Sequence, residues 1–289
     1  MKRTVGEKVF NVFNMFIMII LMIVALYPII YSLFASFSKA SEFIAHTGFL
    51  YKPAGFSLAA YKAVFNNNSI ITGFKNTGIV MAGGLAVSIF LTVLGAYVLS
   101  RKNARLIPYM SLLIIFTMFF GGGLIPGYLN IKSLNLDDTL WVLIVPTAIN
   151  TFNLIVMRTA FDALPIELEE SATIDGAGRF TILFKILLPL VVPTLMVIIL
   201  YYAVQIWNSW FNAMIYLRDR KLFPLQLILR EILILNTKDA IAQSGMDEEG
   251  VSETIQYATM MVATVPILVL YPFLQRYFVK GVMVGAVKG

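Results

Sequence analysis

The sequence contains no cysteine and a single histidine, His46. Without cysteine there is no disulfide framework and no thiolate metal site, and a lone histidine has no second imidazole or thiol with which to share a metal ion. We therefore expect no bound metal and interpret His46 as an ordinary loop residue.

Charge is also scarce: charged residues make up 13% of the chain and hydrophobic residues 59%, with a mean hydropathy of +0.82. Soluble domains are about half apolar and a quarter charged, so this composition predicts an integral membrane protein. The net charge of +6 comes from Lys and Arg that stand singly or in pairs between apolar runs. Such residues are typical determinants of membrane topology, and no nucleic-acid partner is predicted.

Catalytic motifs are missing as well. The sequence has no Gly-x-x-x-x-Gly-Lys-[Ser/Thr] phosphate loop, no His-Glu-x-x-His and no Gly-x-Ser-x-Gly. The chain is therefore not expected to hydrolyse ATP by the phosphate-loop route, to be an enzyme, or to hold a cofactor of its own.

Six long runs contain no charged residue, and each approaches or exceeds the ~20 residues that a helix needs to cross a bilayer. They predict an all-α, polytopic membrane protein with six transmembrane helices in one transmembrane domain, residues 1–289. The runs are 9–38, 76–100, 106–131, 139–157, 186–217 and 254–275.

The distribution of Lys and Arg predicts that both chain ends are cytoplasmic. With that orientation the inside segments hold twelve Lys and Arg against six Asp and Glu, and the outside segments hold ten of each over far more residues. Cytoplasmic segments carry the excess of positive charge, which places residues 162–185 inside and residues 218–253 outside. The outer segment combines an apolar part, Leu222 to Leu235, with acids at Asp247 to Glu253, and we interpret it as a docking surface or, alternatively, a linker.

Ionisable groups are absent from the six runs, although ion-coupled carriers and membrane-embedded hydrolases commonly need them. This absence argues against a self-powered carrier. A stand-alone channel or secondary carrier for a neutral polar solute stays open as an alternative. A glycan enzyme also stays open, with Asp247 to Glu253 as its only outside acidic candidate.

Glycine marks two features within the runs. Gly78, Gly83, Gly84 and Gly95, with Ser88, predict close helix packing in the second run. Gly121 to Gly123 disfavour a regular helix in the third run, and we interpret them as a break that lines a pathway or as a plain hinge.

Neutral polar and aromatic groups in the fourth and fifth runs suit an uncharged, hydroxyl-rich ligand such as a sugar. An interfacial belt or simple packing explains the same residues. The candidates for a substrate pathway are Asn150, Asn153, Tyr201, Gln205, Trp207 and Asn208.

The polar stretch at 162–185 predicts a short amphipathic helix. Pro165 fits a first helical turn, and the glutamates after it complement the positive end of the helix dipole. Leu164, Leu168 and Ala172, four apart, predict one apolar stripe, and Glu167 with Glu170 another face. Gly176 and Gly178 permit a turn into the fifth run, where Pro189 and Pro193 predict a bend.

This stretch resembles the signature loop of binding-protein-dependent ABC importer permeases, Glu-Ala-Ala, three residues, Gly, nine residues, Ile-x-Leu-Pro. Glu170, Ala172, Gly176, Ile186 and Leu188-Pro189 match, and Ser171 stands where the pattern has Ala. The wider segment, with Pro165 to Glu170, Ile174 to Ala177 and Pro189 to Pro193, is similar to the carbohydrate, maltose-type branch. Gly121 to Leu129 and Trp141 to Thr159 are similar to the subgroup for complex oligosaccharide uptake in Gram-positive bacteria.

The resemblance covers all six runs and implies a permease subunit in the bacterial plasma membrane that moves an oligosaccharide inward. It implies two cytoplasmic ATPase subunits that bind the ATP, a second homologous permease and an extracellular solute-binding protein. The loop would be a coupling helix between spans four and five, docked on an ATPase. The residues carried over to this role are Glu167, Glu170, Ala172, Asp175, Gly176 and Ala177.

Overall fold

The computed structural model describes residues 5–101, 105–235 and 253–269, and its regular elements in these ranges are all helical. The β-type pairing found there is an isolated bridge between Ser38 and Phe56. Contacts divide the chain into two compact units, one of Met1–Ile70 with Leu229–Val265, the other of Ile71–Ile228 with Pro266–Gly289.

The first unit contains α1 (Val5–Ser36), α2 (Ala40–Ala45), α3 (Ala59–Asn66) and most of an apolar helix, Glu253–Val269. A small core of Ala35, Phe43 and Leu50 holds α1 to the segment that follows it. Along most of α1 the large apolar side chains are exposed. This is the pattern expected of a helix whose surface faces lipid.

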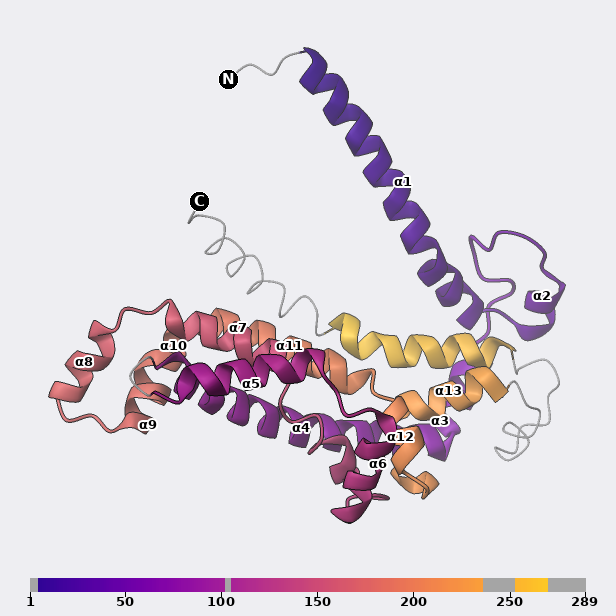
Figure 1. The fold of residues 1–289 in the computed structure, drawn as a ribbon. Coiled ribbons are helices and arrows are strands. Elements are labelled where there is room, and N and C mark those ends of the chain that lie inside the picture. Colours follow the sequence, from indigo (N-terminus) through magenta and orange to yellow (C-terminus); the bar gives the residue numbers. More distant parts are fainter. Residues whose placement is uncertain (1–4, 102–104, 236–252, 270–289) are drawn as a thin grey trace. The chain divides into compact units, whose positions relative to one another are not determined.

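The second unit holds most of α4 and every element from α5 to η3, and in it α4, α5, α7 and α11 run alongside one another (Figure 1). The short helix α8 lies at one end of this group, and α6 and α12 lie toward the other. The element bounds are α4 (Asn68–Ser100), α5 (Ile107–Phe119), α6 (Leu124–Ser133), η1 (Leu140–Leu143), α7 (Thr151–Asp162), α8 (Glu167–Ile174), α9 (Arg179–Thr181), η2 (Ile182–Leu187), α10 (Leu188–Leu190), α11 (Val192–Trp207), α12 (Phe211–Tyr216) and η3 (Arg220–Leu222). A further helix, α13, covers Leu225–Leu235.

Two described helices, Gly6–Ser36 and Asn68–Ser100, are each long and apolar enough to cross a membrane. Two further candidates are broken helices, Ile107–Phe119 with Leu124–Ser133, bent by 115°, and Arg179–Leu190 with Val192–Trp207, bent by 87°. The described residues thus contain two to four candidate spans in a helical membrane protein.

Both breaks fall where glycine or proline was expected to interrupt a helix. The first separates α5 from α6 at residues 120–123, and Gly123 has φ +85°, which favours glycine. The second follows Pro189, which has no N–H to donate to the preceding turn. The π-helical stretch η2 comes before Pro189, and α11 restarts with Pro193 in its first turn.

Three of the six charge-free runs differ in extent from the helices that the structure describes. α4 begins at Asn68, before the run 76–100, and so includes the charged residue Lys75. The run 139–157 opens with the 3₁₀ turn η1, and its α-helix begins only at Thr151. The run 186–217 is divided by the bend and by a second interruption between Trp207 and Phe211. Counting charge-free residues locates apolar chain but not the ends of its helices.

The glycines of α4 do allow close packing. A Cβ at Gly83, Gly84 or Gly95 would lie 2.8–3.1 Å from the end of an Ile or Leu side chain on a neighbouring segment, whereas nothing lies within 4 Å at Gly78. A glycine that the sequence analysis did not single out is tighter still. A Cβ at Gly73 would lie 2.7 Å from the Ile228 Cδ1 atom and 3.1 Å from the Leu225 Cα atom, which is backbone.

The same end of α4 binds the backbone of residues 221–225. The Asn76 amide donates to the carbonyls of Lys221 and Phe223, and the Leu225 N–H donates to the Thr77 hydroxyl. These bonds satisfy backbone groups of an irregular segment.

The loop after α6 is fastened to the loop after α12. The Asp138 carboxylate accepts the backbone N–H groups of Asp219 and Arg218, both at 2.9 Å, and the Asp138 N–H donates to the Tyr216 carbonyl at 3.0 Å. The N–H groups of Asp219 and then Arg218 hold the pKa of the Asp138 carboxyl below its ordinary value, because they stabilise the charged form.

Candidate functional site

The polar stretch forms the short helix that the sequence predicts. α8 begins two residues after Pro165, and Glu167, Glu169 and Glu170 occupy its first turn. The carboxylates of Glu167 and Glu170 are exposed. α8 therefore presents negative charge where its own N–H groups make the potential positive.

α8 ends in a Schellman turn. Gly176 has φ +78°, and its N–H donates to the Thr173 carbonyl at 3.0 Å. The Ala177 N–H reaches back to the Ala172 carbonyl at 2.9 Å. These are the two hydrogen bonds that define the motif, with glycine at its left-handed position and an apolar contact between the residues it brings together.

Four residues of the predicted coupling set lie in this turn: Ala172, Asp175, Gly176 and Ala177. Ala172 is buried in a core cluster with α4, α7 and η2 residues, and Ala177 packs against the same cluster. Asp175 is the exposed C-cap of α8. The turn thus packs one side of α8 against the core, while the carboxylates of Glu167 and Glu170 stay exposed.

The predicted apolar stripe is only partly correct. Leu164 packs against the core and Ala172 is buried, but Leu168 is 38% exposed. Glu169 points inward instead, and its carboxylate accepts hydrogen bonds from Tyr97 and Arg101 at the end of α4. Sequence analysis missed this role, although Glu169 stands three residues before Ala172 and so shares its helical face.

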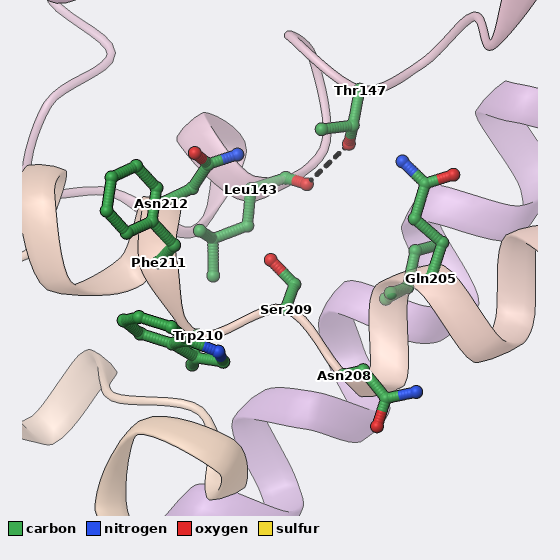
Figure 2. A pocket seen from close by; sticks show the side chains of 9 residues that line it. Leu143, Thr147, Gln205, Asn208, Ser209, Trp210, Phe211 and Asn212 are labelled. Atoms are coloured by element: carbon green, nitrogen blue, oxygen red, sulfur yellow. Dashed lines mark hydrogen bonds between the residues drawn. The ribbon is translucent and has the colours of Figure 1, made fainter. Parts of the chain in front are cut away.

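A pocket of about 270 Å³ lies between α11 and α12. In Figure 2 Gln205 lies on one side of Leu143 and Ser209, and Asn212 lies on the other. Amides, hydroxyls and an aromatic ring around one space can hydrogen-bond and stack on a sugar. The lining residues are Leu143, Thr147, Gln205, Ile206, Asn208, Ser209, Trp210, Phe211 and Asn212.

Of the six predicted pathway residues, Gln205 and Asn208 line this pocket, and the other four lie elsewhere. Asn150 caps α7, where its side chain accepts the N–H of Asn153, and Asn153 is buried. Trp207 is buried with its ring 6.4 Å from the ring of Phe74, and Tyr201 pairs with Phe152.

Tyr202, next to Tyr201 in α11, forms buried hydrogen bonds with two other segments. Its hydroxyl accepts the Asn150 N–H at 2.9 Å and bonds the Thr92 hydroxyl at 2.8 Å, and the side chain is 1% exposed. One hydroxyl therefore joins α4, the start of α7 and α11 and satisfies polar groups that water cannot reach.

The acidic candidates of the outer segment lie mostly outside the described residues. Asp247, Glu248 and Glu249 fall in 236–252, and the structure describes Glu253 at the start of its helix. Among the described residues no group of three or more His, Cys, Asp or Glu is placed to hold a metal ion.

Comparison with known proteins adds a family match. Residues 104–284 match the family described as binding-protein-dependent transport system inner membrane component. A permease of Bacillus subtilis (strain 168), named for polygalacturonan and rhamnogalacturonan transport and called YtcP, is 42% identical over 264 residues, 91% of this chain and 92% of the relative. LplC of the same organism is 39% identical over 290 residues, 100% of this chain and 98% of the relative.

Among solved structures, the fold is similar to a chain from a bacterial ABC transporter involved in the import of the acidic polysaccharide alginate. The TM-score is 0.91 and the identity 32%, with 96% of this chain and 99% of the other covered.

Proposed function

This chain belongs to the family of binding-protein-dependent transport system inner membrane components, and on that premise we propose that α8 is its coupling helix and that oligosaccharide passes beside α11 and α12. As a member of that family the chain is a permease subunit of an ABC importer, located in the cytoplasmic membrane. It is not an enzyme.

The observation that carries the coupling assignment is the Schellman turn at Gly176. It fastens the end of α8 to the core and leaves Glu167 and Glu170 exposed. An ATPase surface with complementary positive charge would bind these carboxylates, and charge complementarity fixes the register of such contacts.

The substrate assignment is supported by relatives and by pocket chemistry. YtcP is named for polygalacturonan and rhamnogalacturonan transport, and the solved transporter imports alginate. The pocket supplies neutral amides and an indole ring. Its 270 Å³ lies just below the ~300–1,000 Å³ of ordinary ligand pockets, so we propose that it holds one part of an oligosaccharide and that a second permease completes the pathway.

The proposed topology has six spans with both ends cytoplasmic, which puts α8 on the side of the ATPases. Besides α1, α4 and the two bent pairs, the remaining spans would be the η1–α7 segment and the helix Glu253–Val269. Because the chain has no cysteine, single introduced cysteines can be labelled from either side of intact cells. Labelling from outside at position 174 would refute this topology.

The functional test is uptake by proteoliposomes that contain this chain with a second permease, two ATPases and the binding protein. We expect uptake of a labelled oligosaccharide to need both ATP and the binding protein. The panel should contain neutral and uronate oligosaccharides, since the relatives include importers of acidic polysaccharides. Uptake by the chain alone without ATP would instead support the channel alternative.

Glu170→Lys tests the coupling assignment within that assay. We expect it to abolish uptake and binding-protein-stimulated ATP hydrolysis, because it places a positive charge against the proposed positive ATPase surface. The amount of permease in the membrane should not change. Wild-type stimulation in this variant would refute the assignment.

A further inference from the structure

The Glu169 carboxylate connects α8 to the end of α4 through both of its oxygens. The Tyr97 hydroxyl donates to Oε1 at 3.0 Å, and Arg101 Nη1 donates to Oε2. The Arg101 guanidinium also lies over the Tyr97 ring, 4.7 Å from its centroid. These three residues form a closed set, which we call the latch.

The latch differs from an ordinary surface ion pair. The Arg101 and Glu169 side chains are only 19% and 16% exposed. Exposed pairs contribute about 0–1 kcal/mol, but removing one partner of a shielded pair leaves an uncompensated charge. The Arg158–Asp162 pair provides a comparison: both of its residues lie within α7, and their side chains are 31% and 30% exposed.

The apolar contacts of α8 cannot replace the latch in fixing its position. Ala172 and Ala177 hold α8 to the core through small, non-directional contacts. A carboxylate held by two donors fixes both the position and the rotation of the helix that carries it.

α4 extends from the latch to the pocket as one helix. It contains no proline, and from Ser100, next to Arg101, to Gly84 it rises roughly 24 Å at about 1.5 Å per residue. At Gly84 the missing side chain lets Ile206 approach, since a Cβ there would lie 2.8 Å from the Ile206 Cδ1 atom. Ile206 itself lines the pocket.

From this arrangement we propose that Glu169 and Arg101 are positioning residues that couple movement of α8 to α4, and through α4 to the wall of the pocket. The inference rests on the proposed function of α8. It assigns different roles to the glutamates of α8. Glu167 and Glu170 face outward, toward the proposed ATPase surface, whereas Glu169 faces inward and couples movement of α8 to α4.

The test uses the complete transporter in proteoliposomes, with sugar transported per ATP hydrolysed as the readout. This ratio reports coupling, whereas a purely structural role would change only the amount of assembled complex, which co-purification measures. The variants are Glu169→Gln, Arg101→Met, their combination, Tyr97→Phe and the exchanged pair Glu169→Arg with Arg101→Glu. Asp162→Asn is the matched control, because it removes a carboxylate charge from an ion pair that lies within one helix.

We expect Glu169→Gln and Arg101→Met each to lower the ratio by roughly 5- to 150-fold, the range of typical couplings between sites. The combination should be no worse than the worse single change, and the exchanged pair should recover part of the loss. Tyr97→Phe removes one donor without changing charge or shape and should give a smaller loss of the same kind. Asp162→Asn should leave the ratio unchanged.

Three results would overturn the latch: an unchanged ratio in both Glu169→Gln and Arg101→Met, losses that multiply in their combination, or an equal loss in Asp162→Asn. If charge removal prevents assembly, Tyr97→Phe decides, and a wild-type ratio there counts against the proposal. Failure of the wild-type complex to import any sugar with ATP would refute the proposed function instead. The two failures are therefore distinguishable.

Discussion

Replacing Gly176 tests whether the backbone conformation of the turn after α8 is needed for coupling. Gly176 has φ +78°, whereas Gly178, two residues later, has φ −69°. A Cβ at either position would meet nothing within 4 Å. Any difference between alanine at the two sites therefore reports backbone conformation and not a steric clash with neighbours.

The expected magnitude follows from the cost of the left-handed conformation, roughly 1–2 kcal/mol for a residue with a Cβ atom. That cost corresponds to about a 5- to 30-fold lower population of the correctly turned loop. Asparagine tolerates this conformation better than alanine. Proline cannot adopt a positive φ, and it also removes the N–H that donates to the Thr173 carbonyl.

Binding-protein-stimulated ATP hydrolysis and uptake in proteoliposomes should therefore decline in the order Gly176, Asn, Ala, Pro, with no uptake left for Pro. Gly178→Ala should behave as wild type. Co-purification of the ATPase subunits shows whether a loss comes from failed docking. Equal damage from alanine at both glycines, or a better result for Ala than for Asn at position 176, would refute the reasoning.

Three further changes test contacts away from α8. Gly73→Ala should lower thermal stability in detergent by about 1–3 kcal/mol, because the new Cβ meets backbone at Leu225, whereas Gly78→Ala should be neutral or stabilising by up to ~1 kcal/mol; equal shifts would contradict the packing described. Tyr202→Phe should cost about 1–3 kcal/mol in the same measurement, since it leaves buried polar partners unsatisfied, and an unchanged midpoint would count against that network. Asp138→Asn should speed amide hydrogen exchange at residues 218 and 219. In the wild type that protection should persist above the ordinary carboxyl pKa of 3.8 and disappear as pH falls through the lowered pKa of Asp138, so a loss near neutral pH would contradict the assignment.

Features set by local backbone chemistry could be predicted from the sequence. Gly121 to Gly123 and Pro189 lie at the two helix breaks, and Gly176 marks a turn because few other residues adopt its φ. The two helix breaks and the turn after α8 were accordingly expected. The start of α4 at Asn68 could not be predicted in this way. The helix extends through polar residues that precede the apolar run, and the apolar pattern does not mark where such an extension begins.

The predicted pathway residues show a limit of a different kind. An asparagine amide serves equally well as a helix cap and as a sugar ligand. Asn150 caps the start of α7, whereas Asn208 ends α11, donates its amide to the Val204 carbonyl at 3.0 Å and also lines the pocket. Only the placement of α7 against α11 distinguishes them, and that placement depends on contacts such as Tyr202 with Asn150, which are distant in sequence.

For Arg101, the count of Lys and Arg predicts the side of the membrane, but only the structure shows what the side chain contacts. It is one of the twelve positive residues that favour a cytoplasmic position for its loop, and in that count it is equivalent to any other Lys or Arg. In the structure its guanidinium is shielded, stacked on Tyr97 and bonded to the one glutamate of α8 that faces inward. A residue needed only for topology would have no reason to lose its hydration, since a solvated charge serves that purpose equally well. The desolvation of this pair is therefore the physical argument that its role lies in positioning α8, and Glu169 is where the coupling of the loop to the spans should be tested.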